Sequence, residues 1–343
     1  MKHFSLHLVI VSLLAFTGAA PAFAQNEPAD TDNNFVEITP DLRKSVESGL
    51  KYLASTQEAD GSFGGTRYGR NVGISSLCCL AFMADGHLPG RGKYGDVVEK
   101  GLKFILDSAN ETGLISADVS HGPMYGHGFA TLFLGEIYGM TGDRRVRETL
   151  VKAVRLIVNS QNDEGGWRYR PEPADADVSV TICQVMALRS AREAGLSVPK
   201  DTIDRAIKYV KECQNSDGGF KYMISSGGSA FPRSAAGVAA LYYAGVYQDD
   251  ALKKGLDYVM MYRHQMNNYA VGHFYYGHYY AVQATYLAGG QYWKQWFPAI
   301  RRELLLRQDT EGKWADAHGE SYGTAMALII LQMPQRYLPI FQR

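Results

Sequence analysis

The sequence predicts an all-α protein in which about six tandem helix pairs close into a ring, giving an α/α barrel of about twelve helices around a central cavity. Three observations lead to this fold class. One helical segment recurs along the chain, each clear copy ends in the same kind of turn, and the two helices of each copy carry different apolar patterns. The chain has 343 residues, of which 46% are apolar, so it can bury a large core.

The N-terminal residues precede the repeats and have a pattern of their own. A basic start is followed by an apolar run over residues 4–20, and an Ala-x-Ala pattern ends at Ala24. This order is typical of a secretory signal peptide, so we expect residues 1–24 to be cleaved and the protein to be exported to the periplasm or outside the cell. An uncleaved membrane anchor is the alternative. Residues 25–38 are polar and predict a flexible leader, and residues 39–343 form the single predicted domain.

Each repeat begins with an amphipathic helix that ends near a glutamine. Apolar residues recur in this helix at three- and four-residue spacing, and its charged residues mark the face that meets water. The period is roughly 50 residues, which is long enough for two helices and two loops. Clear copies end at Gln57, Gln161, Gln214 and Gln308, and weaker copies lie around Ala109 and His264.

An acidic, glycine-containing turn follows each clear copy, and an aromatic residue follows the turn. Glycine can take the left-handed backbone conformation that ends a helix, and the aromatic ring can pack over the turn. The turns are Asp60-Gly61, Glu164-Gly165, Asp217-Gly218 and Glu311-Gly312, and the aromatic residues are Phe63, Trp167, Phe220 and Trp314.

The second helix of each repeat is more continuously apolar and richer in alanine and glycine, as in GISSLCCLAF and GTAMALIILQM. Such helices need cover on both sides, so they are predicted to form an inner ring, with the amphipathic helices outside. An open superhelix needs polar caps at both ends. Because neither terminal repeat is polar, a closed ring is favoured.

The pattern Gln-x(2,4)-Gly-x-Trp/Phe resembles the repeat of squalene and oxidosqualene cyclases and of the β subunits of protein prenyltransferases, which form the terpenoid cyclase/prenyltransferase superfamily. The resemblance extends over nearly the whole chain from Pro40 onward. It implies the α/α toroid fold of that superfamily. It leaves the activity open, because function depends on the residues of the site.

Aligning the inner helices by their apolar runs places one polar residue of each helix at the same level, at the helix start. In a closed ring these positions converge on one mouth of the cavity, where helix N-termini favour anionic groups. We predict a binding or catalytic site here, to which Tyr125 and Tyr279 add aromatic surface. Helix capping is the alternative explanation for Asn71 and Asp177. The six residues are Asn71, His127, Asp177, Arg233, His278 and Tyr322.

The segment Asp175-Ala176-Asp177-Val178 resembles the DxDD motif with which squalene-hopene and class II diterpene cyclases protonate an alkene or epoxide. The resemblance implies that Asp177 is the proton donor, with Asp175 beside it, since two acids this close can keep one carboxyl protonated. Val178 departs from the motif. The chain also has one helical domain, where those cyclases generally enclose the substrate between two.

The sequence predicts no metal, no cofactor and no nucleic-acid partner. Protein prenyltransferases hold zinc with an Asp-x-Cys pair and a His at two inner-helix starts, but here Tyr276-Gly277-His278 and Gly323 occupy those places. The 35 basic and 35 acidic residues balance, so no long-range field attracts nucleic acid. Four cysteines are expected to be small buried hydrophobic residues, and they are Cys78, Cys79, Cys183 and Cys213.

Three functions fit these patterns. The first is a binding protein whose cavity holds an apolar, isoprenoid-like ligand or a protein partner. The second is a terpene-cyclase-like enzyme with Asp177 as proton donor. The third is a polysaccharide lyase or another carbohydrate-active enzyme, in which Arg233 neutralises a uronate and His127 or His278 acts as base. No stable membrane span is expected after signal cleavage.

Overall fold

The computed structural model describes residues 38–64, 68–117, 122–225, 227–267 and 272–342. These residues all belong to one compact unit of the chain, Asn34–Arg343. The predicted signal peptide and nearly all of the predicted leader lie outside the described residues.

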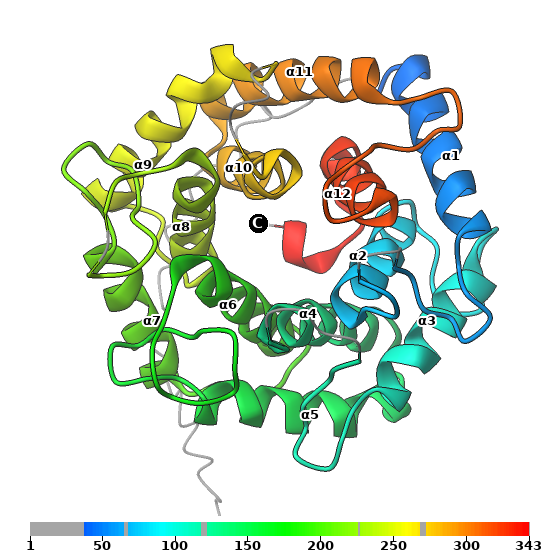
Figure 1. Ribbon diagram of the computed structural model, residues 1–343, viewed down its shortest axis with the longest axis horizontal. Helices are drawn as coiled ribbons and strands as arrows, with labels where there is room; N and C mark the ends of the chain where they lie inside the picture. Colours follow the sequence, from blue (N-terminus) through cyan, green and yellow to red (C-terminus); the bar gives the residue numbers. More distant parts are fainter. Residues whose placement is uncertain (1–37, 65–67, 118–121, 226, 268–271, 343) are drawn as a thin grey trace, which may run out of the picture. The chain divides into compact units, whose positions relative to one another are not determined.

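Two concentric rings of helices make up this unit (Figure 1). The described residues contain twelve α-helices, which alternate along the chain between the outer and the inner ring. The outer helices are α1 (Pro40–Ser55), α3 (Gly95–Asp107), α5 (Arg144–Asn159), α7 (Lys200–Glu212), α9 (Asp250–Met261) and α11 (Gly290–Arg307). The inner helices are α2 (Val72–Met83), α4 (Met124–Thr141), α6 (Val178–Glu193), α8 (Phe231–Tyr243), α10 (Phe274–Ala288) and α12 (Glu320–Gln332).

The ring is closed, and the predicted α/α toroid is confirmed. Each inner helix contacts the next one around the circle, and α12 returns to contact α2. The last repeat is also tied to the first, because the side-chain amide of Gln308 donates a hydrogen bond to the carbonyl of Ser45, 2.9 Å away. The layering follows from the sequence, since the inner helices are buried nearly throughout whereas the outer helices bury one face.

The repeated glutamine joins its own turn to the following outer helix. The Gln161 side-chain amide donates to the carbonyls of Gly165 (2.8 Å) and Thr202 (2.9 Å), and Gln57, Gln214 and Gln308 make the equivalent pairs of bonds. Gly165 has a φ of 99°, and a Cβ there would lie 2.3 Å from the carbonyl oxygen of Arg205. The turn therefore requires glycine for both its backbone conformation and its close packing.

The repeated aromatic residue fixes each of these turns to an inner helix. Trp167 is buried, its indole N–H donates to the carbonyl of Ile157 (2.7 Å), and its backbone N–H donates to the hydroxyl of Thr181 in α6 (3.1 Å). Trp314 repeats this arrangement with Leu304 and Thr324. The residues that follow the aromatic residue are thus held at the start of an inner helix.

The C-terminal segment closes one end of the inner ring. The short helix η3 (Pro339–Phe341) contacts α4 and α6, and it lies inside the ring (red in Figure 1). The backbone N–H of Ile340 donates to the buried carboxyl group of Glu136 (3.0 Å), which also accepts from Ser190 (2.6 Å). Burial raises the pKa of Glu136 to about 7. Glu136 and Ser190 lie in the C-terminal halves of their helices, so η3 packs near the ends of α4 and α6 rather than near their starts.

All four cysteines are buried and unpaired, as the sequence predicts. None of the described helices has both the length and the hydropathy needed to cross a membrane.

Candidate functional site

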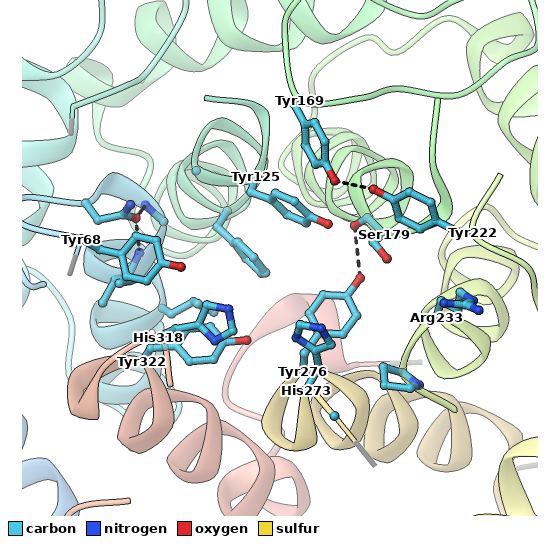
Figure 2. A pocket seen from close by; sticks show the side chains of 18 of the residues that line it. Tyr68, Tyr125, Tyr169, Ser179, Tyr222, Arg233, His273, Tyr276, His318 and Tyr322 are labelled. Carbon is cyan, nitrogen blue, oxygen red and sulfur yellow. Dashed lines mark hydrogen bonds between the residues drawn. The ribbon is translucent and has the colours of Figure 1, made fainter. Parts of the chain in front are cut away.

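A cavity of about 880 Å³ opens among the starts of the inner helices. Every inner helix contributes at least one lining residue from its start, but of the six predicted residues only Asn71, Arg233 and Tyr322 line the cavity. The lining residues at the helix starts include Val72, Tyr125, Ser179, Arg233, Tyr276 and Tyr322, of which the last five are labelled in Figure 2.

Aromatic side chains dominate the lining. It contains two phenylalanines, Phe129 and Phe231, and the apolar residues Ile74 and Leu77 add to it further along α2. Seven tyrosines complete the aromatic surface, namely Tyr68, Tyr125, Tyr169, Tyr222, Tyr262, Tyr276 and Tyr322. A surface of this kind favours a ligand with a large apolar body.

Of the three predicted mouth residues that line the cavity, Asn71 and Arg233 also have structural partners, and Tyr322 is the third. Asn71 caps α2, since its side-chain oxygen accepts from the N–H groups of Gly73 (2.9 Å) and Ile74 (3.0 Å). Arg233 donates to the carbonyls of Phe220 (3.1 Å) and Gly228 (2.7 Å). These bonds use two of the guanidinium donors and fix the group at the cavity wall.

Asp177 lies behind the cavity wall. Its side chain is 0% exposed, and it does not belong to the cavity lining. One carboxyl oxygen caps α6 by accepting from the N–H of Val180 (2.8 Å). The other accepts from the hydroxyl of Tyr222 (3.0 Å) and lies 3.6 Å from Nε of Arg168. Burial raises the pKa of Asp177 to about 6, although the Val180, Tyr222 and Arg168 contacts oppose this rise. Asp175 is on the surface, paired with Arg168.

Tyr222 links the Asp177 carboxyl group to the cavity. The hydroxyl groups of Tyr222 and Tyr169 are hydrogen-bonded, and both side chains line the cavity (Figure 2). The carboxyl group is therefore separated from the cavity by one or two phenolic hydroxyl groups.

His127, His278 and Tyr279 do not line the cavity, which corrects the predicted positions. Nδ1 of His127 accepts from the N–H of Ile115 (3.1 Å), and Nε2 faces the carbonyl of Ala153 in α5 (3.3 Å). Burial lowers the pKa of His127 to about 4, so the ring is neutral.

The other two residues are also enclosed. His278 packs against Phe274 (ring centroids 4.4 Å apart) and Trp296, and burial lowers its pKa to about 3. Tyr279 packs edge-on against Phe129. These side chains miss the cavity because successive residues of an α-helix point in directions that differ by roughly 100° around the helix axis. The cavity-facing residues of α4 and α10 include Tyr125 and Tyr276, two positions before the histidines.

Several lining residues were not predicted from the sequence. Tyr169 and Tyr222 each follow a repeated aromatic residue by two positions. Asp316, which contacts the lining residue His318 without lining the cavity itself, has the same place after Trp314. A search for this position in the repeats would have found them. His318 accompanies Asp316, since its Nδ1 lies 2.7 Å from an Asp316 carboxyl oxygen.

His318 and His273 are the two histidines of the cavity lining. Their ring centroids lie 5.9 Å apart, and the His318 ring stacks on Tyr68 at 5.8 Å. His273 has a φ of 56°, an uncommon conformation for a residue other than glycine. Within the described ranges, no three His, Cys, Asp or Glu side chains gather as metal ligands.

Comparisons with known proteins agree with the fold. A family model described as the prenyltransferase alpha-alpha toroid domain matches residues 7–99 and 99–274. Drimenyl diphosphate synthase from Streptomyces showdoensis is 24% identical over 180 residues, which are 52% of this chain. This match spans about a third of that relative, 32% of its length.

Solved structures of several enzymes share the architecture. Cellobiose 2-epimerase from Spirochaeta thermophila has a TM-score of 0.66 at 12% identity, covering 88% of this chain and 98% of that one. An α-1,6-mannanase of Salegentibacter with bound α-1,6-mannotriose has a TM-score of 0.64 at 9% identity, covering 85% and 98%. A variant of the type II terpene cyclase MstE from Scytonema, with geranylgeranyl dihydroxybenzoate bound, has a TM-score of 0.59 at 13% identity, covering 87% and 98%. These likenesses concern the fold alone.

Proposed function

This chain belongs to the prenyltransferase alpha-alpha toroid family of the terpenoid cyclase/prenyltransferase superfamily, and on this premise we propose that its cavity binds an apolar, isoprenoid-like chain. The observation that carries the proposal is the aromatic lining of the 880 Å³ cavity. Several of its tyrosine hydroxyl groups are bonded within the protein, as with Tyr276 to the carbonyl of Ser179 (3.2 Å) and Tyr169 to Tyr222. A ligand therefore gains mainly from burial against ring surfaces, at about 25 cal/mol per Å² of apolar area.

Binding of farnesol, an uncharged isoprenoid alcohol, tests this proposal. The purified protein is titrated with farnesol, and mannotriose serves as a polar ligand of the kind that a carbohydrate-active enzyme holds. We expect saturable binding of farnesol and none of mannotriose. Ile74→Trp fills the cavity beside α2 and is expected to weaken binding at least about ten-fold.

Leu306→Trp is the matched control, because Leu306 is 76% exposed on the outer ring. It should bind farnesol as the wild type does. Equal binding by both variants, or tighter binding of mannotriose than of farnesol, would refute the isoprenoid proposal.

A second candidate function is an acid-initiated, terpene-cyclase-like reaction with Asp177 as the proton source. It is favoured by the burial of that carboxyl group, by its pKa of about 6 and by its contact with Tyr222. A carboxyl group that is half protonated at about pH 6 can act as a general acid. The test is incubation with geranylgeraniol and detection of a cyclised product of unchanged mass by gas chromatography and mass spectrometry.

Export is also part of the proposal, and it rests on the signal-peptide pattern of residues 1–24. N-terminal sequencing of the protein from the periplasmic and extracellular fractions of its host tests it. The expected first residue is Gln25. A chain that begins with Met1 and remains in the cytoplasmic fraction would contradict it.

A further inference from the structure

We propose that the hydroxyl group of Tyr169 exchanges protons with the ligand in the cavity, and that Tyr222 relays them to and from Asp177. This proposal deepens the second candidate function and rests on it. Asp177 is fully buried, whereas both tyrosines line the cavity. Figure 2 shows the two hydroxyl groups meeting at the cavity wall.

The three groups form a continuous hydrogen-bonded chain. Tyr222 lies between its partners, with the Asp177 carboxyl oxygen 3.0 Å from its hydroxyl oxygen and the hydroxyl of Tyr169 on the other side. Each phenolic hydroxyl has one proton to donate and lone pairs with which to accept. When Tyr222 donates to one neighbour, it can therefore only accept from the other.

The charge of Asp177 consequently sets the direction of the whole chain. Ionised Asp177 accepts from Tyr222, which in turn accepts from Tyr169, so the Tyr169 oxygen offers a lone pair to the cavity. Protonated Asp177 donates to Tyr222, which donates to Tyr169, and the Tyr169 proton is then directed to the cavity. The same residues can thus deliver a proton or remove one.

Proton delivery by this route is balanced. The ligand supplies the electron pair of the new bond to hydrogen and receives the proton of Tyr169. Tyr169 receives the proton of Tyr222, Tyr222 receives the proton of Asp177, and Asp177 is left as a carboxylate. The negative charge rests on Asp177 because burial raises the pKa of Tyr222, which makes its phenolate costly.

The surroundings leave Asp177 as the group of this cluster that titrates near neutral pH. Arg168, beside its carboxyl group, stays positive and is paired with Asp175. Burial raises the pKa of the other described groups that interact electrostatically with Asp177, so they stay neutral, and these are Tyr125, Cys183, Tyr209, Tyr222 and Tyr276.

Nuclear magnetic resonance of the full chain labelled with ¹³C at tyrosine Cζ tests the relay without any ligand. The chemical shifts are followed from about pH 4.5 to 8. We expect the chemical shifts of Tyr169 and Tyr222 to change together with pH, with a midpoint at the pKa of Asp177. Asp177→Asn should abolish both titrations, and asparagine keeps the helix cap of α6.

Tyr222→Phe is the decisive variant, because it removes the middle hydroxyl and leaves the other two groups in place. In this variant the chemical shift of Tyr169 should no longer depend on pH. In Tyr169→Phe the chemical shift of Tyr222 should still change with pH. Tyr247→Phe, at a 51% exposed position, is the control and should change neither signal.

A Tyr169 titration that persists in Tyr222→Phe, or tyrosine signals that are flat in the wild type, would overturn the relay. Thermal melting checks that each variant is folded. Farnesol binding is measured in parallel, so that failure of the relay is distinguished from failure of the proposed ligand.

Discussion

Two opposite sides of the cavity use the same repeat position for different chemistry. The hydroxyl wall consists of Tyr169, Tyr222 and the Asp177 behind them, and the imidazole wall consists of His318 and its partner Asp316. Figure 2 shows Tyr169 and Tyr222 on one side of the cavity and His318 on the other. Tyr169, Tyr222 and Asp316 all follow a repeated aromatic residue by two positions. Tyr169 and Tyr222 line the cavity themselves, whereas Asp316 acts on it only through its contact with the lining residue His318.

Burial is the main difference between the two walls. The Asp177 side chain is 0% exposed and its pKa is raised to about 6, so it can hold a proton. The Asp316 side chain is 12% exposed, and it lies beside the His318 imidazole, whose side chain is 36% exposed. The hydroxyl wall is therefore suited to storing a proton, and the imidazole wall to binding polar groups near solvent.

The largest expected effect is the difference in turnover between variants of Asp177 and of Asp316. Asp177→Asn should lower turnover of geranylgeraniol by about 100- to 10,000-fold, because it removes the proton source. Asp316→Asn should lower turnover by less than about ten-fold, since its bond to His318 lies near solvent. Product formation by mass spectrometry measures both. Equal losses would mean that the walls do not differ in function.

The repeated tryptophans that support the two walls should contribute equally to the free energy of unfolding. Trp167→Ala and Trp314→Ala each remove a buried indole and its hydrogen bond, of 2.7 Å and 2.8 Å respectively. Each should lower the free energy of unfolding by about 3–5 kcal/mol, measured by urea denaturation. Tyr247→Ala, at an exposed position, should change it by less than about 0.5 kcal/mol.

A smaller effect is expected from pH, and its sign follows from the raised pKa of Asp177. The proton is present below pH 6 and is lost as the pH rises through about 6. Turnover should therefore be flat at low pH and fall about ten-fold for each pH unit above 6. A rise of turnover between pH 6 and 7 would contradict Asp177 as the proton source.

Periodicity explains how much of this could be predicted from the sequence. The recurring glutamine, glycine and aromatic residues determine the closed double ring. In each clear copy the glutamine amide makes the same pair of bonds, and the backbone N–H of the aromatic residue donates to a hydroxyl group of an inner helix. The starts of the inner helices meet for the same reason. Asn71, Arg233 and Tyr322 were therefore placed in the lining correctly.

Helical phase and loop conformation could not be predicted in this way. An alignment of apolar runs does not distinguish the face of α4 that carries His127 from the face that carries Tyr125. Tyr169 and Tyr222 lie in the segments between helices, outside the runs that were aligned. Their shared repeat position could have been found in the sequence, but the contact between their hydroxyl groups depends on the packing of two repeats.

The smallest expected effect concerns the imidazole wall alone. His318→Asn removes a ring that stacks on Tyr68 at 5.8 Å and bonds to Asp316 at 2.7 Å. Because the ring is partly exposed, its loss should weaken farnesol binding by at most about five-fold, equivalent to about 1 kcal/mol. Calorimetric titration of the wild type and the variant measures this difference. A loss above about thirty-fold would show that the ligand is held chiefly by the imidazole wall, and the roles assigned to the two sides would have to be exchanged.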